Sequence, residues 1–94
     1  MNRIQCAMIE NLSVINDLII KGDGDPFEIV SDFTKISGSE TINKKLEKLL
    51  CANSEQEIRG VFDNDFIEDD YKRALNKIFL KMYKKESFTL DDII

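Results

Sequence analysis

Apolar residues recur along most of the chain at the spacing of an α-helix, most clearly between residues 66 and 85. Intervals of three and four residues place apolar side chains on one side of a helix. The stripe in this segment consists of Tyr71, Leu75, Ile78, Phe79 and Met82, with Ala74 beside it. Acidic residues precede the stripe and lysines follow it, an order that suits the helix dipole. We therefore predict an amphipathic helix that packs on a core through this stripe.

Leu80 lies outside this stripe, near Asn76 and Tyr83 on the opposite side of the predicted helix. We expect Leu80 to be exposed, because single leucines on protein surfaces are common. A buried leucine at this position would require a second element that covers the outer side of the helix.

Four more segments show helical patterns, separated by short turns. The first covers residues 2–20, and its expected core stripe is Ile4, Met8, Leu12, Ile15 and Ile19. Further apolar residues widen its buried side: Ile9, Val14, Leu18 and Ile20. Because this apolar arc is broad, we expect the helix either to lie at the centre of the bundle or to form a dimer interface.

The other helices are expected at residues 26–36, 40–52 and 55–62. The residues expected to cap or end them are Asp25, Gly38, Ser37 or Ser39, and Ser54. The apolar edges of the helix at 26–36 are Phe27, Ile29, Val30, Phe33 and Ile36. Three lysines of the helix at 40–52 are expected to face solvent: Lys44, Lys45 and Lys48. Three apolar residues near the end of the sequence are expected to pack back on the bundle: Leu90, Ile93 and Ile94.

Composition adds a fold class to this pattern. The sequence has 94 residues, 43% of them hydrophobic, and a single proline. No segment reads as a strand, so we predict one all-α domain over residues 1–94, a compact bundle of four to five helices with short loops. No apolar run approaches the roughly 20 residues of a membrane span, and residues 1–11 lack the layout of a secretion signal. We expect a soluble, cytoplasmic protein.

Candidate chemistry is sparse. The sequence contains no histidine, the commonest general base and metal ligand, so we expect no enzyme, no cofactor and no metal. The acids at 23, 25, 28 and 32 do not have EF-hand spacing. Cys6 and Cys51 lie far apart inside helical patterns, and we expect two buried, reduced thiols rather than a disulfide.

Charge is concentrated in residues 63–70, DNDFIEDD, which hold five carboxylates in a chain of net charge −5. One interpretation is a patch that holds a basic protein partner through an aromatic anchor and surrounding acids. Its residues are Asp63, Asp65, Phe66, Glu68, Asp69, Asp70 and Tyr71. The alternative is structural, with the acids capping the helix and Phe66 and Ile67 stapling it to the core. Both interpretations hold if Ile67 lies inside the protein and Phe66 lies on its surface.

A second candidate surface is the basic outer side of the last helix: Lys72, Arg73, Asn76, Lys77 and Lys81. With the short helix before it, this segment suggests a helix-turn-helix that places arginine, lysine and asparagine in a DNA groove. The acids of the preceding turn oppose DNA binding, because phosphate contacts depend on positive charge. Nucleic acid is therefore the alternative partner rather than the expected one.

Small, acidic helical domains of this type include bacterial immunity proteins, antitoxins and phage-encoded inhibitors, an analogy of class that rests on no shared motif. The paired tyrosine of the colicin nuclease immunity proteins is absent, since Asp70-Tyr71 lacks a second tyrosine. The leading hypothesis is a non-catalytic inhibitor that covers a basic, nucleic-acid-handling toxin or effector. The alternatives are a DNA-binding protein and a helical adaptor or chaperone. A homodimer through the first helix is compatible with each.

Overall fold

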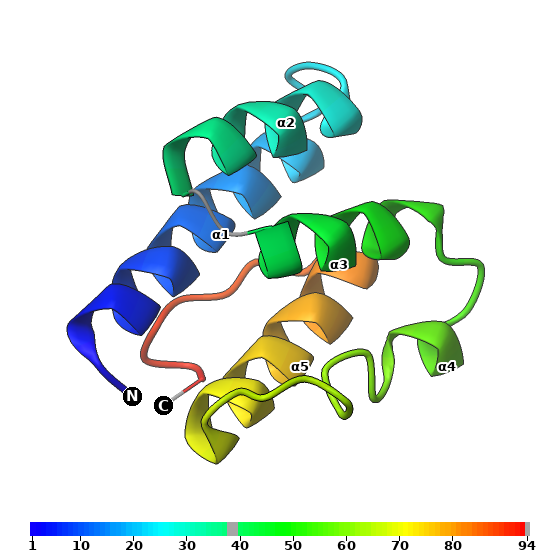
Figure 1. The fold of residues 1–94 in the computed structure, drawn as a ribbon. Coiled ribbons are helices and arrows are strands. Elements are labelled where there is room, and N and C mark those ends of the chain that lie inside the picture. Colours follow the sequence, from blue (N-terminus) through cyan, green and yellow to red (C-terminus); the bar gives the residue numbers. More distant parts are fainter. Residues whose placement is uncertain (38–39, 94) are drawn as a thin grey trace.

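A computed structural model of the protein describes residues 1–37 and 40–93. Its helices are α1 (Arg3–Lys21), α2 (Pro26–Ser37), α3 (Glu40–Cys51), α4 (Glu55–Ile58) and α5 (Asp69–Tyr83) (Figure 1). No strand occurs in the two described ranges, and the predicted all-α bundle is confirmed. The expected helix end at Gly38, the cap at Ser39 and the packing of Ile94 lie outside the described residues. The side chains of Ile36 and Ser37 do so as well.

Local signals explain where the first helices begin and end. Asn2 caps α1 by accepting a hydrogen bond from the Gln5 amide, and the Gln5 side chain accepts one from the Asn2 amide in return. Gly22 ends α1 in the left-handed conformation, with φ of 73°. The carboxylate of Asp25 accepts from the Phe27 amide, which confirms the predicted cap of α2.

The helices pack around one core. α2 contacts both α1 and α3, and α5 contacts α1, α3 and α4. The segment that follows α5 turns back between α1 and α5, as Figure 1 shows. The fully buried side chains come from four helices and from the loop before α5: Ile9, Leu12, Asn16, Leu46, Ile58, Phe62, Leu75, Ile78 and Phe79. The predicted stripe of α5 is confirmed, since all of its members are buried.

The predicted core stripe of α1 is confirmed for Leu12 and Ile15, which are buried, and for Met8 and Ile19, which pack against the core, but it is wrong for Ile4. Its buried residues are Ile9, Leu12, Ile15 and Asn16. Ile4, placed in the core by its spacing, is 73% exposed, and Val14 is 59% exposed. Phe27 on α2 was also expected to be buried and is 51% exposed. Apolar residues surround much of α1, so periodicity alone does not determine which side the other helices cover.

The chain between α3 and α5 also differs from the prediction. α4 ends at Ile58 rather than at residue 62, and α5 begins at Asp69 rather than at residue 66. Arg59, the residue after α4, already has an extended backbone, and Gly60 follows with a φ of 75°, a conformation that residues other than glycine rarely adopt. Leu80, expected to be exposed, is half-buried against the core. α4 packs on α5, so α5 is not open to solvent on every side that lies away from α1 and α3.

Buried polar groups of α1 hold the C-terminal segment. The Asn16 amide group donates to the Glu86 carbonyl at 2.8 Å, and the Ser13 hydroxyl donates to the Phe88 carbonyl at 3.0 Å. Phe88 and Ile93 are buried, which confirms that this segment packs back on the bundle. Asn16 is only 1% exposed, so this hydrogen bond gives its buried side-chain nitrogen a partner, whereas its side-chain oxygen has none in the described residues.

Candidate protein-binding surface

The loop of residues 59–68 is fixed to the body of the protein at several points. Phe62 is fully buried and meets Phe79 edge to face, with 4.9 Å between the ring centroids. Ile67 is half-buried and packs against the core. Between these anchors the backbone makes further turns, closed by hydrogen bonds from Asp63 to Gly60 and from Asp65 to Phe62. The loop therefore has a defined path without being helical.

Lys45 joins α3 to this loop. Its ammonium donates to the Val61 carbonyl at 2.8 Å and lies 3.2 Å from a carboxylate oxygen of Asp65, an ion pair that lacks hydrogen-bond alignment. The same nitrogen is 5.9 Å from the centroid of the Phe62 ring. The Lys45 side chain is 15% exposed, so the prediction that it faces solvent is wrong, whereas Lys44 and Lys48 are exposed. Lys45 is a positioning residue of the loop.

Phe66 is the exposed member of this loop. Its relative exposure is 109%, more than that of any other large apolar residue in the described chain. Its neighbours on both sides are held, Asp65 by Lys45 and Ile67 by the core. Ile67 is half-buried and Phe66 is exposed, which is the arrangement under which the binding and the structural interpretations of this segment are compatible. An exposed aromatic side chain on a fixed backbone is suited to contact with another molecule.

The chain's own cations engage three of the five carboxylates in residues 63–70. Asp65 pairs with Lys45, Glu68 lies 3.2 Å from the amino group of Met1, and Asp70 pairs with Arg73. Asp63 and Asp69 are exposed and form no ion pair within residues 1–37 and 40–93. The negative surface around Phe66 is therefore weaker than the sequence suggests, because neighbouring cations compensate most of it.

A hollow of about 430 Å³ lies beside Phe66. It is lined by Met8, Thr41, Ile42, Asn64, Asp65, Phe66, Ile67 and Tyr71. Apolar side chains from α1, α3 and α5 form part of this lining, and the Asp65 carboxylate contributes a polar edge. The hollow and the exposed ring together form a surface with both a projection and a recess, which we call the Phe66 surface.

Tyr71, one of the residues expected to bind a partner, is only 6% exposed and belongs to the core, with part of it lining the hollow beside Phe66. Its hydroxyl donates to the sulfur of Met8 at 3.5 Å. This arrangement excludes most of the solvent that would stabilise a phenolate. Burial raises the pKa of Tyr71 from 10.0 to about 12.

The raised pKa of Tyr71 predicts a loss of stability at high pH. Above pH 10 the unfolded chain releases the phenol proton while the folded chain retains it, so ionisation favours unfolding. The free energy of unfolding should fall by up to about 1.4 kcal/mol per pH unit from this group, up to the folded pKa. Urea denaturation of the wild type and of Tyr71→Phe between pH 10 and the folded pKa tests this prediction. The stability difference between them should shrink as pH rises, and a constant difference would contradict the assignment.

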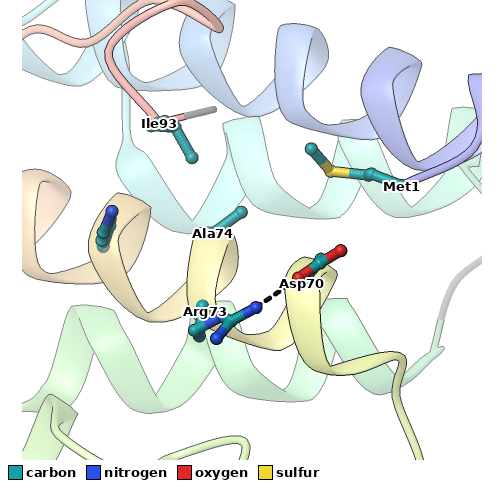
Figure 2. Close-up of a pocket in the computed structure, with 6 residues that line it drawn as sticks. Met1, Asp70, Arg73, Ala74 and Ile93 are labelled. Carbon is teal, nitrogen blue, oxygen red and sulfur yellow. Dashed lines mark hydrogen bonds and ion pairs between the residues drawn. The ribbon is translucent and has the colours of Figure 1, made fainter.

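The alternative nucleic-acid surface does not have the expected geometry. Ten residues, 59–68, separate α4 from α5, whereas a helix-turn-helix has a turn of about three or four residues. Lys72, Asn76 and Lys81 are half-buried, which leaves Arg73 and Lys77 exposed. Figure 2 shows Arg73 directed along α5 to its ion-pair partner Asp70, beside a hollow whose lining includes Ala74 of α5 and Ile93 of the C-terminal segment. The predicted row of free basic groups is therefore interrupted.

Other candidate chemistry is limited. The described ranges contain no group of three or more cysteine, aspartate or glutamate side chains arranged to hold a metal ion. Cys6 and Cys51 are free, Cys6 half-buried and Cys51 exposed, so the prediction of two buried thiols is wrong. Among the helices of residues 1–37 and 40–93, none has the length and hydropathy of a membrane span.

Comparison with protein-family models, with curated protein sequences and with solved structures finds no match to this chain.

Proposed function

We propose that this chain is a small non-catalytic binding protein of the immunity or antitoxin type, which inhibits a basic, nucleic-acid-handling partner by covering it. The observation that supports the proposal is the full exposure of Phe66 on a loop that is otherwise anchored. In protein interfaces, a few such aromatic side chains provide most of the binding energy by filling a pocket on the partner. The inhibition requires no chemistry, only that the covered surface cannot reach its substrate.

The anchored backbone favours tight binding by the Phe66 surface. A flexible loop loses conformational entropy when a partner fixes it, which weakens association. Here Lys45, Phe62 and Ile67 already hold the loop, so this cost falls mainly on the Phe66 ring itself. The loop is therefore preorganised for binding, which favours affinity because little order has to be gained in the complex.

Charge has a smaller role than the acidic sequence of the loop suggests. Asp63 and Asp69 remain to face basic groups of a partner, whereas the other three acids of residues 63–70 are paired internally. The chain as a whole has a net charge of −5 and attracts a basic molecule over a longer range. We therefore assign steering of the encounter to charge, and retention of the partner to Phe66 and the adjacent hollow.

Replacing Phe66 with alanine should abolish most of the binding without affecting the fold. As an interface anchor, the ring should contribute at least about 2 kcal/mol, a roughly 30-fold increase in Kd on truncation. The free energy of unfolding should change by less than about 0.5 kcal/mol, because the ring is outside the core. Titration calorimetry with the partner measures the first quantity and urea denaturation the second. Phe27→Ala, which removes an exposed ring from α2, should leave Kd unchanged.

The partner itself can be identified by photocrosslinking. A photoreactive phenylalanine analogue at position 66 should crosslink a basic protein in the cells that produce this chain, whereas the same analogue at position 27 should not. Purified partner should then lose its activity on nucleic acid when this chain is added. Equal crosslinking from both positions, or a crosslinked partner whose activity is unaffected, would refute the proposal.

The competing proposal, in which α5 binds DNA through Arg73 and Lys77, makes a different prediction. DNA should be retarded in a gel at low salt and released when both residues are changed to glutamate. Such a result would replace the inhibitor proposal, because Phe66 would have no part in it. The third class, a helical adaptor or chaperone, requires a partner helix along α1.

A further inference from the structure

α1 carries a second stripe on its exposed side. Its members are Ile4, Ala7, Asn11, Val14 and Leu18. Alternating steps of three and four residues place them in one line along the helix, the arrangement through which two helices pair in a coiled coil. Ile4 is 73% and Val14 is 59% exposed, Ala7 and Asn11 are exposed, and Leu18 is half-buried. In Figure 1, α1 lies at the edge of the bundle with α2 on one side and the C-terminal segment on another.

The two halves of this stripe have complementary shapes. Along the second half, α1 and α2 enclose a hollow of about 220 Å³. Its lining is mostly apolar: Asn11, Val14, Ile15, Leu18, Ile29, Asp32 and Phe33. Near the start of the helix, Ile4 projects into solvent. A twofold axis that crosses the stripe between these regions would place the Ile4 of each copy in the hollow of the other.

The charges beside the stripe also suit a second copy of the chain. α1 carries Arg3 and Lys21 against Glu10 and Asp17, so it is neutral in a chain of net charge −5. Arg3 and Asp17 are two heptads apart and therefore lie on the same edge of the stripe. An antiparallel pairing that brings Ile4 to Val14 of the other copy also brings Arg3 to its Asp17, twice per dimer. Glu10 lies on the same edge midway between them and meets the Glu10 of the other copy once, at the twofold axis, so two attractive contacts outnumber one repulsive contact. A parallel pairing places no opposite charge beside Arg3.

We propose that this face of α1 binds a second copy of the chain, in an antiparallel pair where each Ile4 fills the hollow between α1 and α2 of its partner copy. The proposal specifies the alignment that the broad apolar arc of α1 leaves open. It is independent of the proposed inhibitory function, because it uses no residue of the loop that carries Phe66. In this alignment Asn11 lies opposite the small Ala7 of the other copy.

Sedimentation equilibrium of the full chain, from micromolar concentrations to about 1 mM, tests the proposal. The wild type should form a dimer. Ile4→Ser should weaken the association constant at least tenfold, a typical effect of truncating an anchor residue, which is about 1.4 kcal/mol. Phe27→Ser removes an exposed apolar side chain from outside the hollow and should have no effect. A wild type that stays monomeric, or a dimer insensitive to Ile4→Ser, would overturn the proposal.

A charge exchange tests the antiparallel alignment separately. Arg3→Asp should weaken the dimer roughly tenfold, because both symmetric contacts become repulsive. Adding Asp17→Arg should restore the association, since each contact regains opposite charges. Both changes suit the helix dipole, with an acid near the start of α1 and a base nearer its end, so circular dichroism should show unchanged helix content. Failure of the second change to restore the dimer would refute the antiparallel alignment.

Discussion

Phe79→Ala is expected to lower the free energy of unfolding by about 3–5 kcal/mol, a large part of the total stability of a domain of this size. Phe79 is fully buried and contacts Phe62 edge to face at 4.9 Å. Truncation removes the apolar area of the ring and leaves a cavity at the point where α5 meets the loop. The loss should appear as a lower urea midpoint, followed by circular dichroism, with an unchanged slope.

The contribution of the aromatic pair itself is measured with a double-mutant cycle. Phe62→Leu, Phe79→Leu and the combination should give a coupling energy of about 0.5–1.5 kcal/mol. Leucine retains most of the buried volume, so the cycle reports mainly the contact between the rings. A Phe79→Ala variant that loses less than about 1 kcal/mol would contradict its position in the core.

Lys45→Met is expected to destabilise the protein by about 1–3 kcal/mol and to loosen the loop of residues 59–68. Methionine retains an apolar stem, but the Val61 carbonyl and the Asp65 carboxylate lose the ammonium that they share. Both side chains of the ion pair are mostly shielded, with 15% of Lys45 and 24% of Asp65 exposed. The remaining carboxylate would be poorly solvated, which is the main source of the expected loss.

Two measurements separate the effects of Lys45→Met. Urea denaturation reports the global stability, and hydrogen exchange of the amides of Asp63 and Asp65 reports the order of the loop. Lys44→Met is the matched control, because Lys44 is exposed on the same helix, and it should change stability by less than about 0.5 kcal/mol. Equal effects of the two variants would show that Lys45 does not hold the loop. Weaker partner binding by Lys45→Met with the Phe66 ring intact would show that loop order contributes to affinity.

Local patterns predict much of this fold because their causes act within a few residues. The apolar stripe of α5, the cap at Asp25 and the glycine that ends α1 depend on helix geometry and neighbouring hydrogen bonds. The C-terminal end of α4 was harder to predict. The extended backbone of Arg59 and the positive φ of Gly60 depend on how the following turn folds.

The candidate site was predicted less well, because its properties depend on partners distant in sequence. The position of Phe66 among five acids identified it as a possible anchor, whereas helical periodicity placed Lys45 on a solvated face. Lys45 is 20 positions before Asp65, and only the packing of α3 brings the two together. Glu68 and Met1 meet for the same reason, 67 positions apart. Lys45 has the helical spacing of an exposed lysine, so its position along the helix does not indicate that it is buried. Which segment covers a long side chain follows only from the packing of the folded chain.

The sequence by itself determined that the chain forms amphipathic helices and that its negative charge gathers before the last one, since both follow from residue type and spacing. Tertiary structure alone decided which part of the apolar arc of α1 became core and which remained exposed. It also decided which carboxylates stayed free of the chain's own cations. Helix formation responds to interactions a few residues apart, whereas burial and ion pairing depend on which distant segments the packed chain brings into contact.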